Sequence, residues 1–200
     1  MTTLDLLLKR FATKLFDTER KVAPEDLQYI LECARLSCSS VNIQPWKILV
    51  VTNPELRAAL REASYNQPQV TDAGCLLVLC TVKDAHARLD RTAALIEVGS
   101  GAESAAKYVA MAKGSFRPTE QGQLEWLTRQ TYLALQAMII AAAERGLDSC
   151  PMEGFQPQRY TEILGLTDVV PTVLLPIGYA RAPGLPKVRV PLEDIVEYLT

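Results

Sequence analysis

Short polar side chains are concentrated in residues 39–46, which read Ser-Ser-Val-Asn-Ile-Gln-Pro-Trp. Hydroxyl and amide groups on such short side chains can approach a polar ligand closely. Pro45 fixes its own φ and disfavours the α region for Gln44, so a preceding helix must end upstream and a strand can begin at Trp46. The segment is therefore either an ordinary turn between a helix and a strand, where Ser and Asn are common, or one wall of a binding site.

Two further groups of residues could act together with such a loop. Basic residues cluster near each end of the chain, at Lys9, Arg10 and Lys14 and again at Arg181, Lys187 and Arg189. Each cluster allows a local anion site because phosphate oxygens accept strong, charge-assisted hydrogen bonds, although solvated surface charge explains each one alone. Residues 151–155, Pro-Met-Glu-Gly-Phe, predict a turn whose backbone amides can face a ligand.

Several common kinds of catalytic site are not supported by the sequence. A Ser-His-Asp triad would have to use His86, the one histidine, and no serine stands in a G-x-S-x-G motif. No spacing of His and Cys suits a metal ion, and neither G-x-G-x-x-G nor G-x-x-x-x-G-K-[ST] occurs. A metal site, triad hydrolysis and phosphoryl transfer are therefore not expected.

Composition and charge limit the partners and the compartment. The formal net charge of −2 does not suggest nucleic acid as a ligand. Residues 1–10 do not resemble a signal peptide, and the most apolar stretch, 131–143, has about half the length needed to cross a bilayer. Five cysteines without a C-x-x-C pair indicate reduced thiols. We expect a cytoplasmic protein with neither a membrane nor a nucleic acid as partner.

The spacing of apolar residues predicts the elements that must position these groups. Helices are expected over 3–14, 24–37, 54–64, 122–145, 157–164 and 192–199, less regular helices over 85–113, and strands over 46–52, 76–82, 147–152 and 171–179. The run 76–82 has no polar face and predicts a central strand covered on both sides, whereas prolines limit pairing of 171–179. Helix 122–145, ended by Gly146, is apolar nearly all round, so it must lie under the sheet or under a second subunit. Residues 1–200 are expected to form one domain.

Four motifs occur along the chain in this order: Lys9-Arg10-x-x-Thr13-Lys14-x-Phe16-Asp17, Ser39-Ser40-x-Asn42-x-Gln44-Pro45-Trp46, Pro151-x-Glu153-Gly154-Phe155 and Leu185-Pro186-Lys187-x-Arg189. In order and spacing they resemble the oxygen-insensitive NAD(P)H nitroreductases, FMN enzymes that work as intertwined homodimers. The resemblance covers nearly the whole chain. It implies an α+β fold with a small mixed, mainly antiparallel sheet flanked by helices, and cofactors at the subunit interface.

The resemblance also implies a role for each motif. The FMN phosphate would be held by Arg10, Lys187 and Arg189, and the pyrimidine end of the flavin by Lys14 and Asn66. The cofactor of the opposite subunit would be reached by Ser39, Ser40 and Asn42. The isoalloxazine would lie along Pro151, Met152, Glu153 and Gly154, with the backbone N–H of Glu153 close to N5. Lys14 and Glu153 are the expected catalytic residues, since a lysine near N1 and O2 stabilises the negative charge of the reduced flavin.

Three cofactor-binding positions depart from the family pattern. Ala12 stands where the family usually has serine, which removes one hydrogen bond worth roughly 1 kcal/mol. Phe11 replaces a more usual polar residue. Gln69 lies where close relatives carry a second lysine, so stabilisation of the reduced flavin should be weaker and reactivity with oxygen higher.

The implied activity is reduction of nitroaromatics, quinones or pteridine-like compounds by NADH or NADPH, in a two-electron ping-pong cycle. Two alternatives stay open. One is a flavin-fragmenting or dehalogenating relative with the same fold. The other is a cofactor-free helical interaction module, whose basic residues only solvate the surface.

Overall fold

The computed structural model describes residues 1–199. The helices are α1 (Thr3–Lys9), α2 (Pro24–Arg35), α3 (Pro54–Glu62), α4 (Gln69–Asp72), α5 (Ala85–Ser100), α6 (Ala102–Lys113), α7 (Glu120–Glu144) and α8 (Pro157–Leu164), with 3-10 turns η1 (Ser40–Asn42) and η2 (Leu192–Asp194). The strands are β1 (Trp46–Val51), β2 (Cys75–Val82), β3 (Asp148–Ser149) and β4 (Val169–Gly178). The predicted α+β class is confirmed.

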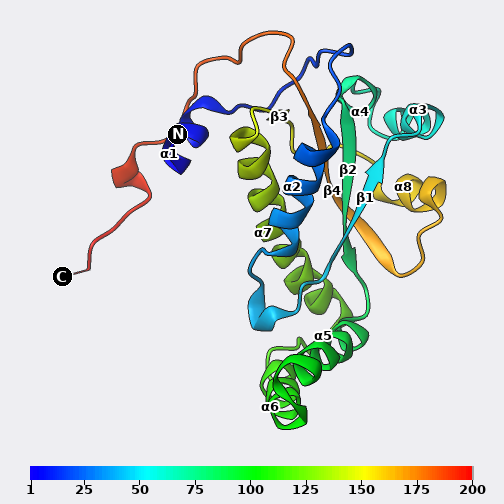
Figure 1. The fold of residues 1–200 in the computed structure, drawn as a ribbon, viewed down its shortest axis with the longest axis vertical. Helices are drawn as coiled ribbons and strands as arrows, with labels where there is room; N and C mark the ends of the chain where they lie inside the picture. The colour runs from blue at the N-terminus through cyan, green and yellow to red at the C-terminus, as the bar shows by residue number, and fades with distance from the viewer. Residues whose placement is uncertain (200) are drawn as a thin grey trace.

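The strands form one sheet in the order β1-β2-β4-β3, and each neighbouring pair is antiparallel. An isolated parallel bridge joins Ala12 to Ser149 beside β3, so the predicted mixed, mainly antiparallel sheet is confirmed. Helices α2 and α7 cover one face of the sheet, and α3 and α8 cover the other (Figure 1). The strand β2 therefore lies in the middle of the molecule, as its continuous apolar run predicts.

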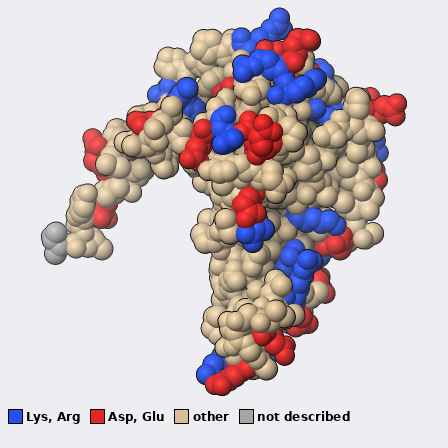
Figure 2. Space-filling view, viewed as in Figure 1, with Lys and Arg blue, Asp and Glu red and all other residues tan. Residues whose placement is uncertain are grey.

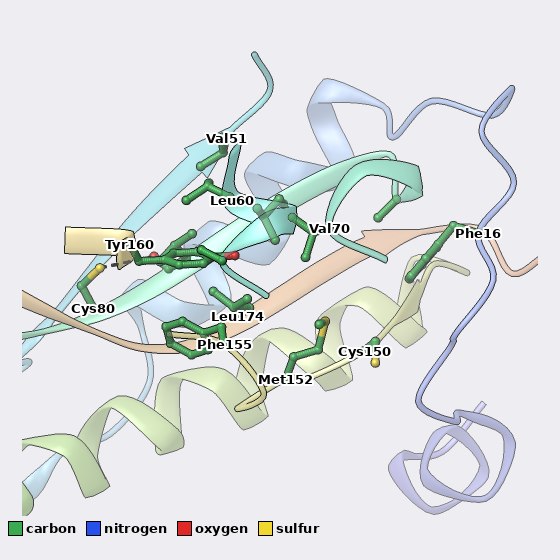
Figure 3. Close-up of a cluster of buried hydrophobic side chains, with 14 of the residues drawn as sticks. Phe16, Val51, Leu60, Val70, Cys80, Cys150, Met152, Phe155, Tyr160 and Leu174 are labelled. Atoms are coloured by element: carbon green, nitrogen blue, oxygen red, sulfur yellow. Dashed lines mark hydrogen bonds between the residues drawn. The ribbon is translucent and has the colours of Figure 1, made fainter. Parts of the chain in front are cut away.

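Side chains of β2 alternate between two buried clusters. Leu76, Val78 and Cys80 pack with Tyr160 of α8 on one face (Figure 3), whereas Leu77 and Leu79 pack against α7 on the other. This alternation follows from the two-residue period of a strand. Because both faces are buried, the sheet gives a rigid base for the loops at its ends.

The longest helix, α7, packs on the sheet as predicted, but within one chain it is buried along one side only. It begins at the N-cap Thr119, whose hydroxyl accepts the N–H of Gly122. It ends before Gly146, which adopts a φ of 72°, the left-handed conformation that favours glycine after a helix. Leu133 stays 42% exposed on the outer side, so the fold of one chain leaves an apolar part of α7 uncovered.

The predicted ends of two helices are wrong. The first helix stops at Lys9 and not near Lys14, because Arg10 has extended dihedrals and Thr13 N–H bonds to Ser149 O, which draws the chain along the sheet. The last helix, expected over 192–199, is only the short turn η2, and its apolar side chains find no surface of the same chain to cover.

Two predictions about strands also need correction. Regular pairing in 147–152 is limited to β3 and a single bridge between Met152 and Leu174. The prolines of β4 do not prevent pairing along most of the strand. Pro171 lies opposite Cys80, where a register shift between Leu79 and Cys80 accommodates the missing N–H.

Two parts of the chain extend away from the sheet. Helices α5 and α6 pack together and project at the lower end of the molecule in Figure 1, and residues 182–199 form an arm that leaves the body near α1. Within residues 1–199, no helix combines the length and the hydrophobicity that a membrane span requires. On the face drawn in Figure 2, lysine and arginine are interspersed with acidic residues and are most frequent at the upper end.

Candidate functional site

The two basic clusters meet at the end of α1. The ammonium of Lys187, on the arm, donates a 2.6 Å hydrogen bond to the carbonyl of Arg10. Arg189 follows two residues later, and it lowers the pKa of both Arg10 and Lys187 by repulsion, although burial is the larger cause for each. Three cations are therefore held together without a carboxylate that pairs with them in residues 1–199.

Arg10 also carries two buried nitrogen atoms, Nε and Nη2, that have no hydrogen-bond partner in residues 1–199. Buried donors are almost always paired, so an unpaired guanidinium indicates a missing acceptor. Within the same range the hydroxyl of Thr13, only 1% exposed, is unpaired as well. The structure thus has donors and positive charge for an anion with several oxygen atoms, which is what a phosphate group offers.

A cavity of about 390 Å³ opens beside this cluster, between residues 11–15 and 182–185. Phe11 and Ala12 line it together with Lys14, whose ammonium makes only a weak 3.5 Å contact with the thiol of Cys150. The arm approaches closely here, because a methyl group at Gly184 would overlap the ring of Phe11. The structure thus brings the first and last motifs of the sequence into one site.

The third motif, residues 151–155, follows directly on Cys150. Met152 points into the core with Phe155 (Figure 3) and bonds through its backbone to Leu174, which fixes the residues on either side of it. Pro151 is half-buried, and Glu153 and Gly154 are exposed. Among residues 1–199, the backbone N–H of Glu153 has no acceptor, in contrast to those of Met152 and Phe155.

The side chain of Glu153 is held by a partner that the sequence did not indicate. The hydroxyl of Tyr132, on α7, donates a 2.5 Å hydrogen bond to Oε1 of Glu153. Burial, followed by the bond to the carboxylate, raises the pKa of Tyr132, so its hydroxyl stays protonated at neutral pH. A tyrosine on a predicted buried helix resembles an ordinary core residue, and only the contact reveals its position.

The loop before α4 is hydrogen-bonded to the residues at and just after the third motif. Gln67 donates a 2.7 Å hydrogen bond from its amide to the carbonyl of Gly154, and Gln156 N–H bonds to Ala63 O. Ser64 donates to Leu60 O, so the hydroxyl of Tyr160 must donate to Ser64. These bonds hold the loop that carries Asn66 and leads to Gln69.

The two predicted residues of this loop differ in exposure. Asn66 is exposed with a φ of 58°. Gln69 is 4% exposed, and its Oε1 has no partner among the described residues. A buried, unpaired amide oxygen at a position expected to face the cofactor is consistent with that expectation, since a ligand donor would satisfy it.

The loop before β1 is anchored by its own side chains. Ser39 Oγ accepts the N–H of Gln44 at 3.0 Å, and Ser40 N–H donates to Oε1 of Gln130 on α7 at 2.8 Å. Asn42 stays exposed and accepts from the amide of Gln44. The hydroxyl and amide groups are therefore presented on a fixed backbone.

Backbone strain is confined to the two loops just described. Within residues 1–199, the non-glycine residues with positive φ are Val41, Asn42, Gln44, Tyr65 and Asn66. Positive φ is costly for a β-branched residue such as valine, and strain of this kind is concentrated at functional sites. Both loops are thus candidates for ligand contact on grounds that the sequence did not provide.

The predicted residues do not all meet within one chain. Ser40 is bonded to Gln130, and Glu153 is bonded to Tyr132. These two partners on α7 are two positions apart, so they point in directions about 200° apart around the helix. The 3-10 turn η1 lies far from α1 and the arm in Figure 1. The chain therefore presents one group at residues 10–14, 66–69, 151–154 and 187–189, and a second group at 39–42 on another face.

Comparison with known proteins identifies the family. The sequence model described as the nitroreductase family matches residues 7–179. The chain belongs to the nitroreductase family. A Bacillus subtilis protein named as an NAD(P)H nitroreductase, YfkO, is 36% identical over 215 residues, which are 98% of this chain and 96% of YfkO. A Staphylococcus haemolyticus protein with the same kind of name is 35% identical over 204 residues, 95% of this chain and 94% of that protein.

Solved nitroreductase structures share the fold. A nitroreductase of Exiguobacterium sibiricum, solved in complex with FMN, superposes with a TM-score of 0.87 at 27% identity, covering 100% of this chain and 98% of that one. An NAD(P)H:FMN oxidoreductase from Staphylococcus epidermidis gives a TM-score of 0.91 at 22% identity, covering 99% and 96%. The predicted nitroreductase-like fold is confirmed.

Proposed function

We propose that this nitroreductase-family protein is an FMN-dependent NAD(P)H oxidoreductase of the cytoplasm. It reduces nitroaromatics, quinones or similar electron-poor acceptors in a two-electron ping-pong cycle. The observation that carries the proposal is the cluster of Arg10, Lys187 and Arg189, with two unpaired buried nitrogens on Arg10. This donor set suits the phosphate of FMN, and the names of YfkO and of the FMN-bound Exiguobacterium protein support the same cofactor and electron donor.

The working unit is a homodimer. One chain separates Ser39, Ser40 and Asn42 from its own phosphate cluster, so these residues can reach a cofactor only in a neighbouring copy. The arm supports this proposal, because it exposes a series of apolar side chains that its own chain does not cover: Leu185, Val188, Val190, Leu192, Ile195, Tyr198 and Leu199. A second copy would bury them, since exposed apolar surface of this extent marks an interface.

The residues of the site have separate tasks. When bound, FMN would supply hydride transfer between NAD(P)H and the acceptor. Arg10, Lys187 and Arg189 would hold its phosphate, and the N–H of Glu153 would donate to its ring. Lys14 places a positive charge where reduction adds negative charge, a form of electrostatic stabilisation that works best where water is excluded.

The first experiment is the colour and reactivity of the purified protein. We expect bound FMN to be released on denaturation, bleaching by NADH or NADPH in stopped flow, and reoxidation by nitrofurazone or menadione. A colourless protein that does not bind added FMN would favour the interaction module. Rapid bleaching followed by breakdown of the flavin, or by halide release from a halogenated aromatic, would favour the fragmenting or dehalogenating relative.

The close approach of Gly184 to Phe11 gives a prediction. In Gly184→Ala the added methyl group would overlap the ring, so the arm carrying Lys187 and Arg189 must shift. We expect FMN affinity to fall by roughly tenfold, the equivalent of one lost charge-assisted hydrogen bond. Fluorescence titration with FMN measures it. Gly99→Ala is the control, because a methyl group there meets nothing within 4 Å, and equal affinity in both variants would contradict the prediction.

A second prediction concerns the bond from Tyr132 to Glu153. Tyr132→Phe removes the donor that fixes the Glu153 side chain, so the neighbouring N–H is held less firmly. Since small misplacements are costly in catalysis, we expect the flavin reduction rate to fall up to about tenfold, with FMN affinity unchanged. Tyr29→Phe is the matched control, because the hydroxyl of Tyr29 also donates to a glutamate, Glu144, on the surface. Equal reduction rates in the two variants would exclude a positioning role for Tyr132.

A further inference from the structure

A second cavity, of about 840 Å³, is lined by residues just after β2, the start of α5, the turn from α6 into α7 and the first residues of β4. None of the expected cofactor-binding residues lines it. Its volume lies within the range of roughly 300–1,000 Å³ that is typical of small-molecule sites. The cavity is therefore large enough for a ligand of its own.

The wall contains an unpaired amide. Oε1 of Gln123 accepts the backbone N–H of Arg117 at 2.7 Å, which fixes the orientation of the side-chain amide. The other end, Nε2, is buried and has no acceptor in the part of the chain that the structure describes. A buried NH₂ group of fixed direction indicates a site for an oxygen atom.

The charged side chains of the wall favour an anion. Lys83, Lys113 and Arg117 line the cavity, and none of them forms an ion pair within residues 1–199. The wall also holds two acids, Glu120 and Asp84, which accepts the N–H of Ala87 as the N-cap of α5, so the three cations outnumber the acids by one. The positive ends of α5 and α7 meet here too and add to the same potential.

The remaining wall is apolar and aromatic. Phe116 packs edge-on against His86, with ring centroids 4.8 Å apart, and also contacts Trp126 at 6.1 Å. Leu124 and Val170 complete this side. A flat apolar group fits such a wall, and offset or edge-to-face contacts with Phe116 would orient it.

We propose that this cavity is a second ligand site, which binds a small aromatic carboxylate. The ring lies against Phe116, Leu124 and Val170, and the carboxylate is held by Gln123 Nε2 with Arg117 and Lys113. Its lining residues differ from those expected to bind the flavin in the same chain. Arg117 is well placed for this role, because its guanidinium lies 5.8 Å above the ring of Trp126 and is free of any carboxylate in the described chain.

Calorimetric titration of the FMN-loaded protein with 2-naphthoate tests the proposal. This probe has a flat ring and a carboxylate but no group that the flavin can reduce. We expect 2-naphthoate to bind at least about tenfold more tightly than 2-naphthalenemethanol, which has the same ring and no charge. Equal binding of the two compounds, or no binding of 2-naphthoate, would overturn the proposal.

Variants then locate the bound probe. Gln123→Glu keeps the acceptor for Arg117 N–H but replaces the NH₂ donor by a carboxylate oxygen, and Arg117→Gln removes the cation; we expect each to weaken binding at least tenfold. Lys107→Gln, on the outer side of α6 in an exposed pair with Glu103, is the control and should bind as the wild type does. Wild-type affinity in both cavity variants would place the probe elsewhere, for example over the flavin, and would refute the assignment.

Discussion

Arg10→Ala is expected to reduce FMN affinity by roughly 10- to 100-fold, because a charge-assisted hydrogen bond contributes about 1.5–3 kcal/mol. The side chain has two buried nitrogens without a partner, so the phosphate is the acceptor that they lack. Without FMN the substitution should cost little stability, since it removes unsatisfied donors and relieves repulsion with Arg189. Fluorescence titration gives the affinity, and thermal unfolding with and without FMN separates the two effects.

The control for this variant is Arg159→Ala, which removes an exposed arginine that, within residues 1–199, pairs only with Glu162 on the same helix. It should leave FMN affinity unchanged. Arg189→Ala should weaken FMN binding as Arg10→Ala does. Added salt should lower the FMN affinity of the wild type more steeply than that of Arg10→Ala or Arg189→Ala. FMN affinity at the wild-type level in both Arg10→Ala and Arg189→Ala would mean that the phosphate binds elsewhere.

Sequence patterns correctly predicted the elements that neighbouring residues in the chain determine. The apolar run of β2 and the apolar stretch and terminal glycine of α7 depend on neighbouring residues, and both elements lie where they were expected. The predictions failed where contacts with residues far away in the sequence determine the local structure. Residues 10–14 continue the apolar spacing of α1, yet the backbone of Thr13 pairs with Ser149, about 140 residues later, and such pairing has no local signal.

The same distinction applies to the candidate site. Motifs and their order pointed to Arg10, Lys187 and Arg189, and the structure brings their segments together. Tyr132 was missed because its role arises from one hydrogen bond between a helix and a distant turn. Likewise, Gln130 supports the 39–42 loop through a contact that periodicity cannot predict. The polar loop itself is strained and anchored, which favours the binding interpretation over the ordinary turn.

Lys14→Gln is expected to lower the two-electron reduction potential of the bound flavin by about 30–60 mV, the equivalent of losing one charge-assisted hydrogen bond of roughly 1.5–3 kcal/mol. Lys14 lines the smaller cavity, and its only hydrogen bond in residues 1–199 is the weak contact with Cys150, so the ammonium is available to a ligand. Dye-linked photoreduction measures the potential. Lys9→Gln, the same change on an exposed residue at the end of α1, should leave it unchanged.

Gln69→Lys tests the same electrostatic argument in the opposite direction. A lysine at this 4% exposed position would supply the second cation that the family resemblance implies there, so the flavin potential should rise and the reoxidation rate with oxygen should fall. Without the flavin, a buried unpaired ammonium is costly, so we expect the FMN-free variant to lose stability and FMN to restore much of it. A potential that Gln69→Lys leaves unchanged, in a variant that still binds FMN, would show that residue 69 does not face the flavin. A potential unchanged by Lys14→Gln would contradict the role of Lys14 in the same way, whatever the outcome at residue 69.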